Sequence, residues 1–302
     1  MVTVFLTGAT GYLGSTFLST IPETWNIVCY GRHPPVGPQQ PNVTWNRGDI
    51  SNEQDRISIP EGVDAIIHLA AIKGQGSCAN NPSEVIKTNI LGTHRLLDAA
   101  KEHDIKKFIF GSTYWVYSDI SDSPLDEKMP VSPHEMYGLS KAVSEIEIMS
   151  SDIEYTILRF TNIFGMGSGI HPEEVVYHFI HSARTGLPIL LEYGGKQVID
   201  FIDVTDACSA LKTVTESGSA SNEIFNIGSG IPRSIASVGQ IVREICQQKF
   251  NISVPIVTGL SENTGMKQRI VSIEKFHRTF PNIKFRSFEE SVDMYIDNFP
   301  VI

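Results

Sequence analysis

Short apolar runs alternate with amphipathic stretches through the first half of the chain. The run from Val2 to Leu6 is β-branched and ends at a glycine turn, which predicts a buried strand. The stretch from Pro82 to His103 carries apolar residues at helical spacing and predicts a long helix. The same reasoning predicts strands at 26–30, 43–45, 64–70, 107–110 and 154–159, and helices at 12–20 and 133–150. This alternation up to about residue 160 is typical of a parallel sheet with helices on both faces.

The pattern of apolar positions becomes less regular beyond residue 160. Helices are predicted at 173–185, 205–216, 235–250, 273–280 and 287–299, with a strand at 223–227. In the stretch 189–202, Gly194 and Gly195 stand between two apolar arms and predict a hairpin or two short strands. The expected fold class is therefore α/β, with a Rossmann-type doubly wound parallel sheet and a smaller C-terminal α+β substrate lobe. We expect residues 1–160, joined by some later segments, to bind a dinucleotide, and residues 161–302 to form mainly the substrate lobe.

The composition narrows the class of partner. The 302 residues carry a formal net charge of −10 and contain no run of Lys or Arg, which argues against a nucleic-acid partner. The four cysteines lie far apart without a CxxC pair, so neither a metal site nor a disulfide framework is expected. No apolar stretch approaches the ~18 residues of a membrane helix, and the first residues lack the basic segment of a signal peptide. We therefore expect no membrane contact and a cytoplasmic location.

Three glycines follow the first predicted strand with the spacing GxxGxxG. In a dinucleotide site, Gly8 permits the tight turn, Gly11 lets the backbone approach the pyrophosphate, and Gly14 lets the helix pack against the strand. The helix that starts here directs N–H groups and the positive end of its dipole toward the phosphates. A purely structural turn is the alternative, but the position between a strand and a helix favours a dinucleotide site. The residues assigned to it are Gly8, Thr10, Gly11, Tyr12, Leu13 and Gly14.

The end of the second predicted strand indicates which dinucleotide fits. An acidic residue there would bond the ribose 2′-hydroxyl of NAD, but residues 28–33 contain no Asp or Glu. Arg32 can pair with a 2′-phosphate through a charged bidentate contact, and its alternative role is that of a solvated loop arginine. We therefore expect NADP(H) as the preferred cofactor, with NAD(H) possible.

A tyrosine and a lysine four residues apart, Tyr137 and Lys141, share one face of a predicted helix. A lysine charge about 4 Å from the phenol is worth roughly 4 kcal/mol at an effective dielectric near 20, or about three pKa units. We expect this charge to bring the pKa of Tyr137 close to neutral for general acid–base catalysis. Ser112 and Thr113 follow a predicted strand, at the edge where open α/β sheets bind ligands, and such hydroxyls can hold the reacting oxygen. The alternatives are a surface tyrosine and a turn or cap hydroxyl.

The order of these motifs resembles the extended short-chain dehydrogenase/reductase family, in particular its nucleotide-sugar epimerases, reductases and dehydratases. The resemblance extends from residue 7 to residue 228, and the combination of motifs is specific. The matching segments are Thr7–Gly14, Gly48–Ile50, His68–Ala71, Asn89–Thr93, Ser112-Thr113 with Val116-Tyr117, Tyr137–Lys141, Leu158–Phe160 with Asn162, Asp200–Val204 with Asp206, and Phe225–Gly228.

The resemblance implies which further residues contact the cofactor. Asp49 and Ile50 would bracket the adenine, and Asn89 would support the helix that carries Tyr137. Lys73 matches a lysine that UDP-galactose 4-epimerases direct at the cofactor. The residues implied to bind the cofactor, besides the glycine loop and Arg32, are Asp49, Ile50, Leu69, Ala70, Ala71, Lys73, Asn89, Tyr137 and Lys141, with Lys141 on the nicotinamide ribose.

The resemblance also implies a substrate and an assembly. Asn162 would contact the diphosphate of a nucleotide sugar, and the helices at 82–103 and 133–150 would form the four-helix bundle of a homodimer. Tyr114 and Trp115 stand where 4,6-dehydratases of the family carry Asp-Glu, so we do not expect water elimination.

A second departure concerns diphosphate binding. Ile199 replaces the arginine that commonly precedes Asp200 and binds diphosphate in the family. Either Arg233 or Arg269 compensates, or the substrate lacks a diphosphate.

Three functions therefore stay open. The leading one is an NAD(P)-dependent enzyme that reduces a 4-keto group or epimerises C4 of a nucleotide sugar, with Tyr137 exchanging the proton. The second is an NADPH-dependent reductase of a small non-sugar carbonyl compound, which Ile199 favours; Tyr114 would suit a flat substrate there, although core packing is the commoner use of aromatic residues. The third is a non-catalytic NADP-sensing protein, against which the retention of Thr113, Tyr137 and Lys141 counts.

Overall fold

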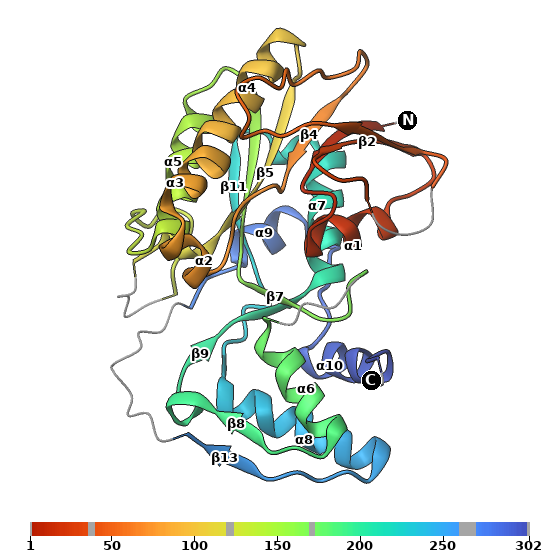
Figure 1. The fold of residues 1–302 in the computed structure, drawn as a ribbon, viewed down its shortest axis with the longest axis vertical. Coiled ribbons are helices and arrows are strands. Elements are labelled where there is room, and N and C mark those ends of the chain that lie inside the picture. The colour runs from red at the N-terminus through yellow and green to blue at the C-terminus, as the bar shows by residue number, and fades with distance from the viewer. Residues whose placement is uncertain (1, 36–39, 119–123, 169–172, 260–269, 301–302) are drawn as a thin grey trace.

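A seven-stranded parallel sheet forms the centre of the larger domain. The computed structural model describes residues 2–35, 40–118, 124–168, 173–259 and 270–300. The strands run in the order β11-β6-β5-β4-β1-β2-β3 (Figure 1), which confirms the Rossmann-type doubly wound arrangement. Their bounds are β1 Val2–Thr7, β2 Trp25–Gly31, β3 Val43–Arg47, β4 Ala65–His68, β5 Lys107–Thr113, β6 Glu154–Phe160 and β11 Glu223–Ile227.

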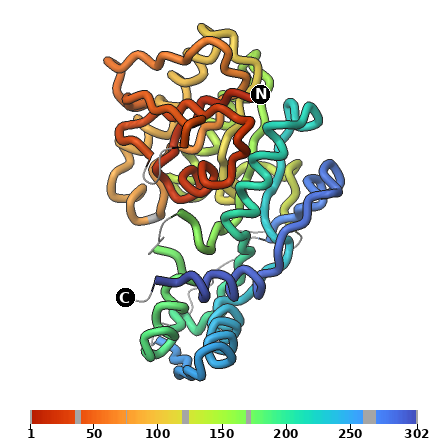
Figure 2. The backbone as a smooth tube through the Cα atoms, turned by 90° about the vertical axis from the view of Figure 1, so that its right-hand side faces the viewer, coloured from red at the N-terminus to blue at the C-terminus, as the bar shows by residue number. Residues whose placement is uncertain are grey.

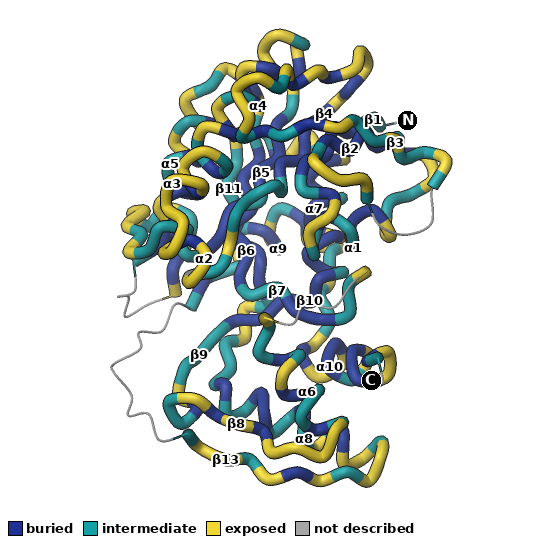
Figure 3. Tube along the Cα trace, viewed as in Figure 1, coloured by how far each residue is buried: buried dark blue, intermediate teal, exposed yellow. Residues whose placement is uncertain are grey.

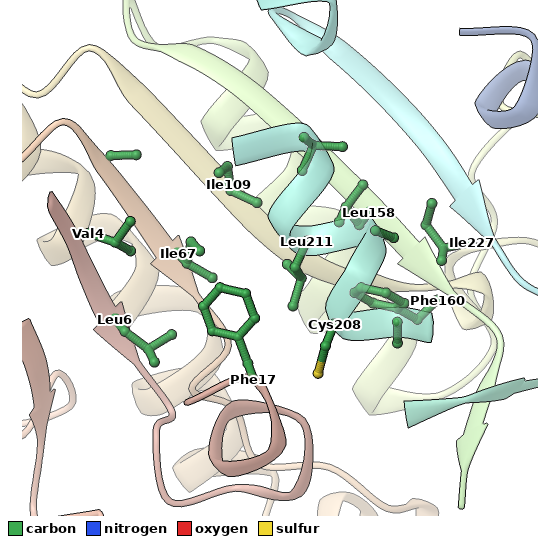
Figure 4. Close-up of a cluster of buried hydrophobic side chains, with 14 of the residues drawn as sticks. Val4, Leu6, Phe17, Ile67, Ile109, Leu158, Phe160, Cys208, Leu211 and Ile227 are labelled. Atoms are coloured by element: carbon green, nitrogen blue, oxygen red, sulfur yellow. The ribbon is translucent and has the colours of Figure 1, made fainter. Parts of the chain in front are cut away.

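Helices cover both faces of this sheet because successive residues of a strand point to opposite sides. On β1, Val4 and Leu6 join one apolar core, whereas Phe5 joins the other. The first core packs against α1, α7 and α9, and Figure 4 shows many of its side chains. The second core packs against α4 and α5. These helices are α1 Tyr12–Thr20, α4 Gly92–Glu102, α5 Met136–Met149, α7 Val204–Glu216 and α9 Glu274–Thr279.

The helix predicted at 82–103 is confirmed as one continuous helical stretch. It consists of α3 (Pro82–Val85), the π-helical η1 (Ile86–Leu91) and α4. A preceding helix, α2 (Gln75–Asn80), is missing from the sequence-based expectations because its residues show no apolar period. π-helical turns inside α-helices are frequent at functional sites, which draws attention to the residues of η1.

A smaller lobe lies below the sheet in the view of Figure 1 and has a core of its own. Its helices α6, α8 and α10 contribute buried apolar residues to this core, and dark blue segments mark buried residues on them in Figure 3. Figure 2 shows the same lobe turned by 90°. Short strands pair within it: β7 with β10, β8 with β13, and β9 with β12. The bounds are α6 Val175–Thr185, α8 Ile235–Phe250, α10 Phe288–Asp297, β7 Asn162–Phe164, β8 Ile189–Leu191, β9 Val198–Ile199, β10 Phe201–Asp203, β12 Arg233–Ser234 and β13 Ile256–Thr258.

The hairpin considered for residues 189–202 is wrong, and the alternative of short strands is correct. Between β8 and β9, the short helical turn η3 (Glu192–Gly195) holds Tyr193, Gly194 and Gly195 at positive φ. This left-handed backbone turns the chain aside, so β8 and β9 pair with distant strands instead of with each other. Two 3-10 turns complete the structure, η2 (Tyr114–Val116) and η4 (Gly218–Ala220). None of the helices in the described ranges combines the length and apolarity that crossing a bilayer requires.

Candidate active site

The glycine loop runs from the end of β1 into α1 and has no room for side chains at two of its glycines. Gly8 has a φ of +79°, and a Cβ there would lie 2.6 Å from the backbone N of Ala70. A Cβ at Gly14 would overlap the carbonyl O of Gly8. The N-cap residue of α1 is Gly11, which offers no side-chain cap, and this suits an anion at the helix N-terminus.

A cavity of about 550 Å³ opens beside this loop. It is bounded by the carboxyl ends of β1, β2, β3 and β4, the edge at which open α/β sheets bind ligands. The lining residues that the sequence assigned to the cofactor are Gly8, Thr10, Gly11, Arg32, Asp49, Ile50, Leu69, Ala70 and Ala71. The cavity joins glycine backbone, apolar side chains and a few polar groups, so the residues present fit a dinucleotide. The predicted cofactor residues that are not part of its lining are Tyr12, Leu13, Gly14, Lys73, Asn89, Tyr137 and Lys141.

Sequence reasoning missed one wall of this cavity. Ser77, Asn81, Glu84 and Thr88 line it, from α2 to η1. The polar positions that follow the carboxyl end of β4 within about twenty residues are the signal that could have indicated them, because ligands bind at that edge.

Arg32 follows the end of β2, and its side chain is 73% exposed. Its Nε lies 4.0 Å from Oδ2 of Asp49, which is too long for a hydrogen bond. The Asp49 carboxylate instead accepts hydrogen bonds from the backbone N and the hydroxyl of Ser51, at 2.9 and 2.7 Å. Arg32 is therefore held loosely and can reach an anion in the cavity.

Two other predicted cofactor residues lie where the domains meet. The Tyr12 hydroxyl donates to the carbonyl O of Gly165 at 2.5 Å, which ties α1 to the segment after β7. Burial lowers the pKa of Lys73, and the carboxylates of Glu173 and Glu174 act in the opposite direction. Lys73, which follows β4, thus faces the segment that starts α6.

Asn89 lies in the π-helical η1 and is buried. Its Nδ2 donates to the carbonyl O of Ile72 and to the hydroxyl of Ser140, both at 2.9 Å, and its Oδ1 accepts from the backbone N of Ile72 at 2.8 Å. Ser140 belongs to α5, and its hydroxyl donates to the carbonyl O of Tyr137. Asn89 therefore links the loop after β4 to the helix that carries Tyr137, without lining the cavity.

The end of β5 and the start of α5 meet at the carboxyl edge of the sheet. β5 extends three residues beyond its predicted end and includes Ser112 and Thr113, both buried. A Cβ at Gly138 would overlap the carbonyl O of Trp115, so α5 packs directly on the turn after β5. The Thr113 hydroxyl accepts a hydrogen bond from the backbone N of Trp115 at 3.3 Å and caps η2. The Ser112 hydroxyl donates to the carboxylate of Glu145 at 2.5 Å.

Lys141 is almost fully buried between α5 and β5. Its Nζ donates to the carbonyl O of Gly111 at 2.8 Å and lies 4.4 Å from the ring centroid of Phe110. Burial lowers the pKa of Lys141 to about 7, and the negative charge of Glu145 opposes this shift.

The expected effect of Lys141 on Tyr137 is wrong. Burial raises the pKa of Tyr137 above its usual value, and Cys78 adds to the rise. The cost of removing a phenolate from water exceeds the attraction of the lysine, whose ammonium is directed at the backbone of β5. Tyr137 is therefore a neutral phenol in this structure, suited to donate a proton first.

Two residues assigned to the substrate are in direct contact. The Nδ2 of Asn162 on β7 donates to the hydroxyl of Tyr114 at 2.7 Å. Tyr114 is buried and packs edge-on against the ring of Trp115. The two residues connect the start of the smaller lobe to the turn after β5.

Arg233 lies on β12 directly opposite Ile199 on β9. Its Nη2 donates to Glu289 at 2.9 Å, and its guanidinium lies 5.2 Å from the ring centroid of Phe288. Arg269 lies outside the described residues. Among the residues that are described, no three His, Cys, Asp or Glu side chains gather as they would around a metal ion.

Known proteins are similar to this chain in sequence and in fold. The model of the NAD dependent epimerase/dehydratase family matches residues 4–228. The low-salt glycan biosynthesis protein Agl12 of Haloferax volcanii is 31% identical over 76% of this chain and 78% of its own length. A dTDP-glucose 4,6-dehydratase of Streptomyces antibioticus is 30% identical over 75% of this chain and 72% of its own.

A solved structure matches nearly the whole chain. It is a UDP-N-acetylglucosamine 4-epimerase from Methanobrevibacter ruminantium in complex with UDP-N-acetylmuramic acid, with a TM-score of 0.86 and 24% identity. The match covers 99% of this chain and 98% of that one, and it shows that the fold is shared.

The buried Lys141 makes the free energy of unfolding depend on pH. Its folded pKa of about 7 lies below its ordinary value of 10.5, so the unfolded chain holds the proton more tightly and stability rises as pH increases between these values. In Lys141→Met this rise disappears, which should flatten the slope between about pH 7.5 and 9 by at most about 1.4 kcal/mol per pH unit. Urea denaturation measures the slope, with Lys106→Met, an exposed lysine, as the control. Equal slopes in wild type and Lys141→Met would show that Lys141 is not a desolvated amine.

Proposed function

This chain belongs to the NAD dependent epimerase/dehydratase family, and from this premise we propose that it acts as an enzyme at C4 of a nucleotide sugar. The reaction is epimerisation at C4 or reduction of a 4-keto group. When bound, the nicotinamide supplies or takes up the hydride, while Tyr137 exchanges a proton with the 4-oxygen. The observation that supports this proposal is the packing of α5, which carries Tyr137, on the end of β5, which carries Thr113: Lys141 donates to the carbonyl O of Gly111. Gly111 in turn lies against Leu69, a residue that lines the glycine-loop cavity.

The chain's own residues divide the work in the proposed site. The backbone of the glycine loop and the N-terminus of α1 hold the pyrophosphate, and Asp49 with Ile50 flanks the adenine. The hydroxyl of Thr113 orients the 4-oxygen toward Tyr137. The charge of Lys141 stabilises the phenolate whenever Tyr137 has given up its proton. Ser112 supports the site without contacting the substrate, since its hydroxyl donates a hydrogen bond to Glu145.

Epimerisation or reduction fits this site better than dehydration. Elimination of water needs an acid and a base beside the substrate, and the two positions after Thr113 carry Tyr114 and Trp115. The hydroxyl of Tyr114 accepts from Asn162 and is buried, so these residues shape the site and do not supply a carboxyl group.

NADP(H) is the cofactor we propose, with NAD(H) as the alternative that the family description carries. β2 ends without an acidic residue, and the side chain that follows it is the loosely held guanidinium of Arg32. A guanidinium forms bidentate hydrogen bonds with a phosphate and has no such partner on a bare ribose hydroxyl.

Arg233 is the residue we propose for the substrate diphosphate. Residues directly opposite each other in an antiparallel pair share one face of the sheet, so Arg233 lies on the same face as Ile199. The guanidinium that the family commonly places at position 199 would then come from the neighbouring strand. Asn162 and Tyr114, which are hydrogen-bonded to each other, are the further substrate residues that we propose.

The proposed assembly is a homodimer through α5 and the helical stretch formed by α3, η1 and α4. These helices contact each other along one side of the sheet (Figure 1) and expose large apolar side chains, which monomers rarely gather in one patch. A two-fold axis would pair this surface with itself as a four-helix bundle. The exposed residues are Ile86, Leu91, Leu139, Ile146 and Met149.

The cytoplasm is the compartment we propose. Cys29, Cys78, Cys208 and Cys246 are all buried as free thiols, and none forms a disulfide. Free thiols persist where glutathione keeps proteins reduced.

The reaction is tested by incubating the protein with NADPH or NAD and a panel of UDP-, dTDP-, CDP- and GDP-linked sugars and their 4-keto forms. We expect a C4 epimer or a C4-reduced sugar by NMR, and net consumption of NADPH selects reduction. Tyr137→Phe should bind cofactor normally but lose at least about 100-fold in turnover, because acid–base catalysis contributes 10²–10⁴. Tyr155→Phe, on β6, is the matched control. Turnover of small non-sugar carbonyls alone would favour the second function, and full activity in Tyr137→Phe would exclude its role.

Arg32→Ala should weaken NADP binding by about 10- to 100-fold, because a hydrogen bond to a charged group contributes about 1.5–3 kcal/mol. Binding of NAD should change by less than about twofold. Calorimetric titration with both dinucleotides measures the ratio, and Arg56→Ala, another exposed arginine, should leave both affinities unchanged. Equal losses for NADP and NAD would remove the phosphate role from Arg32.

Ile146→Asp should convert the proposed dimer into a monomer, because a charge at the centre of a buried apolar interface stays unpaired. Light scattering after size exclusion measures the mass. Leu187→Asp places the same charge on an exposed apolar residue of the smaller lobe and should leave the dimer intact. A wild-type protein that is monomeric at micromolar concentration would refute the proposed assembly.

A further inference from the structure

Glu145 and Arg159 form a fully buried ion pair next to the proposed catalytic groups. Glu145 lies on α5 one helical turn after Lys141, and Arg159 lies on β6 directly opposite Ser112 of β5. Their side chains are 1% and 2% exposed. The carboxylate oxygens of Glu145 accept from Nε at 3.0 and 3.2 Å and from Nη2 at 2.6 Å, which is a bidentate contact.

A chain of hydrogen bonds extends this pair across the sheet. Nη1 of Arg159 donates to the hydroxyl of Tyr117 at 2.8 Å, and this hydroxyl donates to Oδ1 of Asn226 on β11, also at 2.8 Å. Nδ2 of Asn226 donates to the carbonyl O of Leu125 and of Ser272, at 3.0 and 3.1 Å. Because the members hold one another in place, the carboxylate of Glu145 has a fixed position.

The contacts of α5 with β5 show what this fixed position controls. Gly111 and Ser112 are successive residues of β5; the carbonyl O of Gly111 accepts from Lys141, and the hydroxyl of Ser112 donates to Glu145. Two side chains one turn apart on α5 therefore form hydrogen bonds with two adjacent residues of the strand. Thr113 is the next residue of β5, so a shift of these hydrogen bonds moves its hydroxyl relative to α5.

Stability alone does not explain an ion pair at this place. Removing two charges from water costs several kcal/mol per ion, and well-packed apolar residues of similar volume are often as stable or more stable. We propose that Glu145 is a positioning residue of this site, which with Arg159 as its counter-charge sets the end of β5 against α5 and holds the charge of Lys141 in place. The kinetic part of this inference rests on the proposed function.

In the described part of the chain, the titratable groups around Lys141 other than Glu145 are neutral, so Glu145 is the group that stabilises the charge of Lys141. On β4, burial and the charge of Lys141 lower the pKa of His68 to about 3, so His68 is neutral. On α5, burial keeps Tyr137 neutral. Phe110 and the carbonyl O of Gly111 carry no titratable proton. Glu145 is the anion that raises the pKa of Lys141 among the described residues, and its removal should lower that pKa below about 7.

The double variant Glu145→Leu/Arg159→Met tests the proposal, because it removes both charges and leaves neither one buried alone. We expect it to fold with near wild-type stability. Its kcat should fall by roughly 100-fold with KM within about twofold, since a displacement of about 1 Å costs this much. The alkaline limb of its pH–rate profile should move to lower pH. NMR of ε-labelled lysine, assigned with Lys141→Met, should show Lys141 titrating at lower pH.

The control is Thr156→Val. Thr156 lies on β6, the same strand as Arg159, and this substitution removes its buried hydrogen bond to the carbonyl O of Ala220. It should lower stability without moving the Lys141 titration or the pH profile. A folded double variant with the wild-type kcat and the wild-type Lys141 titration would overturn the proposal.

Two further measurements test the proposal if the double variant does not fold or if the wild type is inactive. If the double variant does not fold, Ser112→Ala breaks only the link between β5 and Glu145; kcat should then fall about tenfold with the Lys141 titration unchanged, and a wild-type kcat would overturn the positioning role. If the wild type converts no nucleotide sugar, the proposed function fails, but the Lys141 titration in the double variant still tests the electrostatic role of Glu145.

Discussion

Burial of charge at the carboxyl edge of a parallel sheet is the constraint on which the rest of this structure depends. Lys141, Glu145 and Arg159 are each 1–2% exposed, although each carries a group that water solvates strongly. An ionised side chain so placed needs partners with fixed geometry, since its desolvation costs several kcal/mol. Here the partners are one another and the backbone of β5, so the requirement for pairing also fixes how α5 lies on the sheet.

The apolar layers supply the free energy that this arrangement costs. Full burial of one large apolar side chain contributes about 1.5–3 kcal/mol, so a few such residues offset one buried charge. β1 alone provides Val4, Phe5 and Leu6 at 0% exposure, and both faces of the sheet continue this pattern. The middle of each central strand is therefore mostly apolar, and Ser112, Thr113 and the cavity residues lie at the carboxyl ends.

Sequence patterns predicted the features that depend on local spacing. The helical period places Tyr137 and Lys141 along one face of α5, and the glycine spacing marks the turn from β1 into α1. Features that depend on tertiary contacts were missed or wrong. In the sequence alone, Glu145 has the spacing of an ordinary solvated helix residue. Its pairing with Arg159 on β6 is a tertiary contact that the sequence does not report. The expected lowering of the pKa of Tyr137 was wrong because burial raises this pKa by more than a nearby lysine lowers it. Residue spacing does not report burial.

The two halves of the proposed site differ in how tightly they are built. The half proposed for proton and hydride chemistry stands on long strands with two cores and a continuous chain of buried hydrogen bonds. The half that would read the substrate stands on two- and three-residue strands, such as β9 and β12, whose pairing brings Arg233 opposite Ile199. A substitution on such a strand would change the side chain offered to the proposed substrate and leave the seven-stranded sheet untouched, because β9 and β12 are not part of that sheet. The geometry proposed for C4 chemistry is thus independent of the lobe proposed to bind the sugar nucleotide, because the charges that fix the first half lie outside the second.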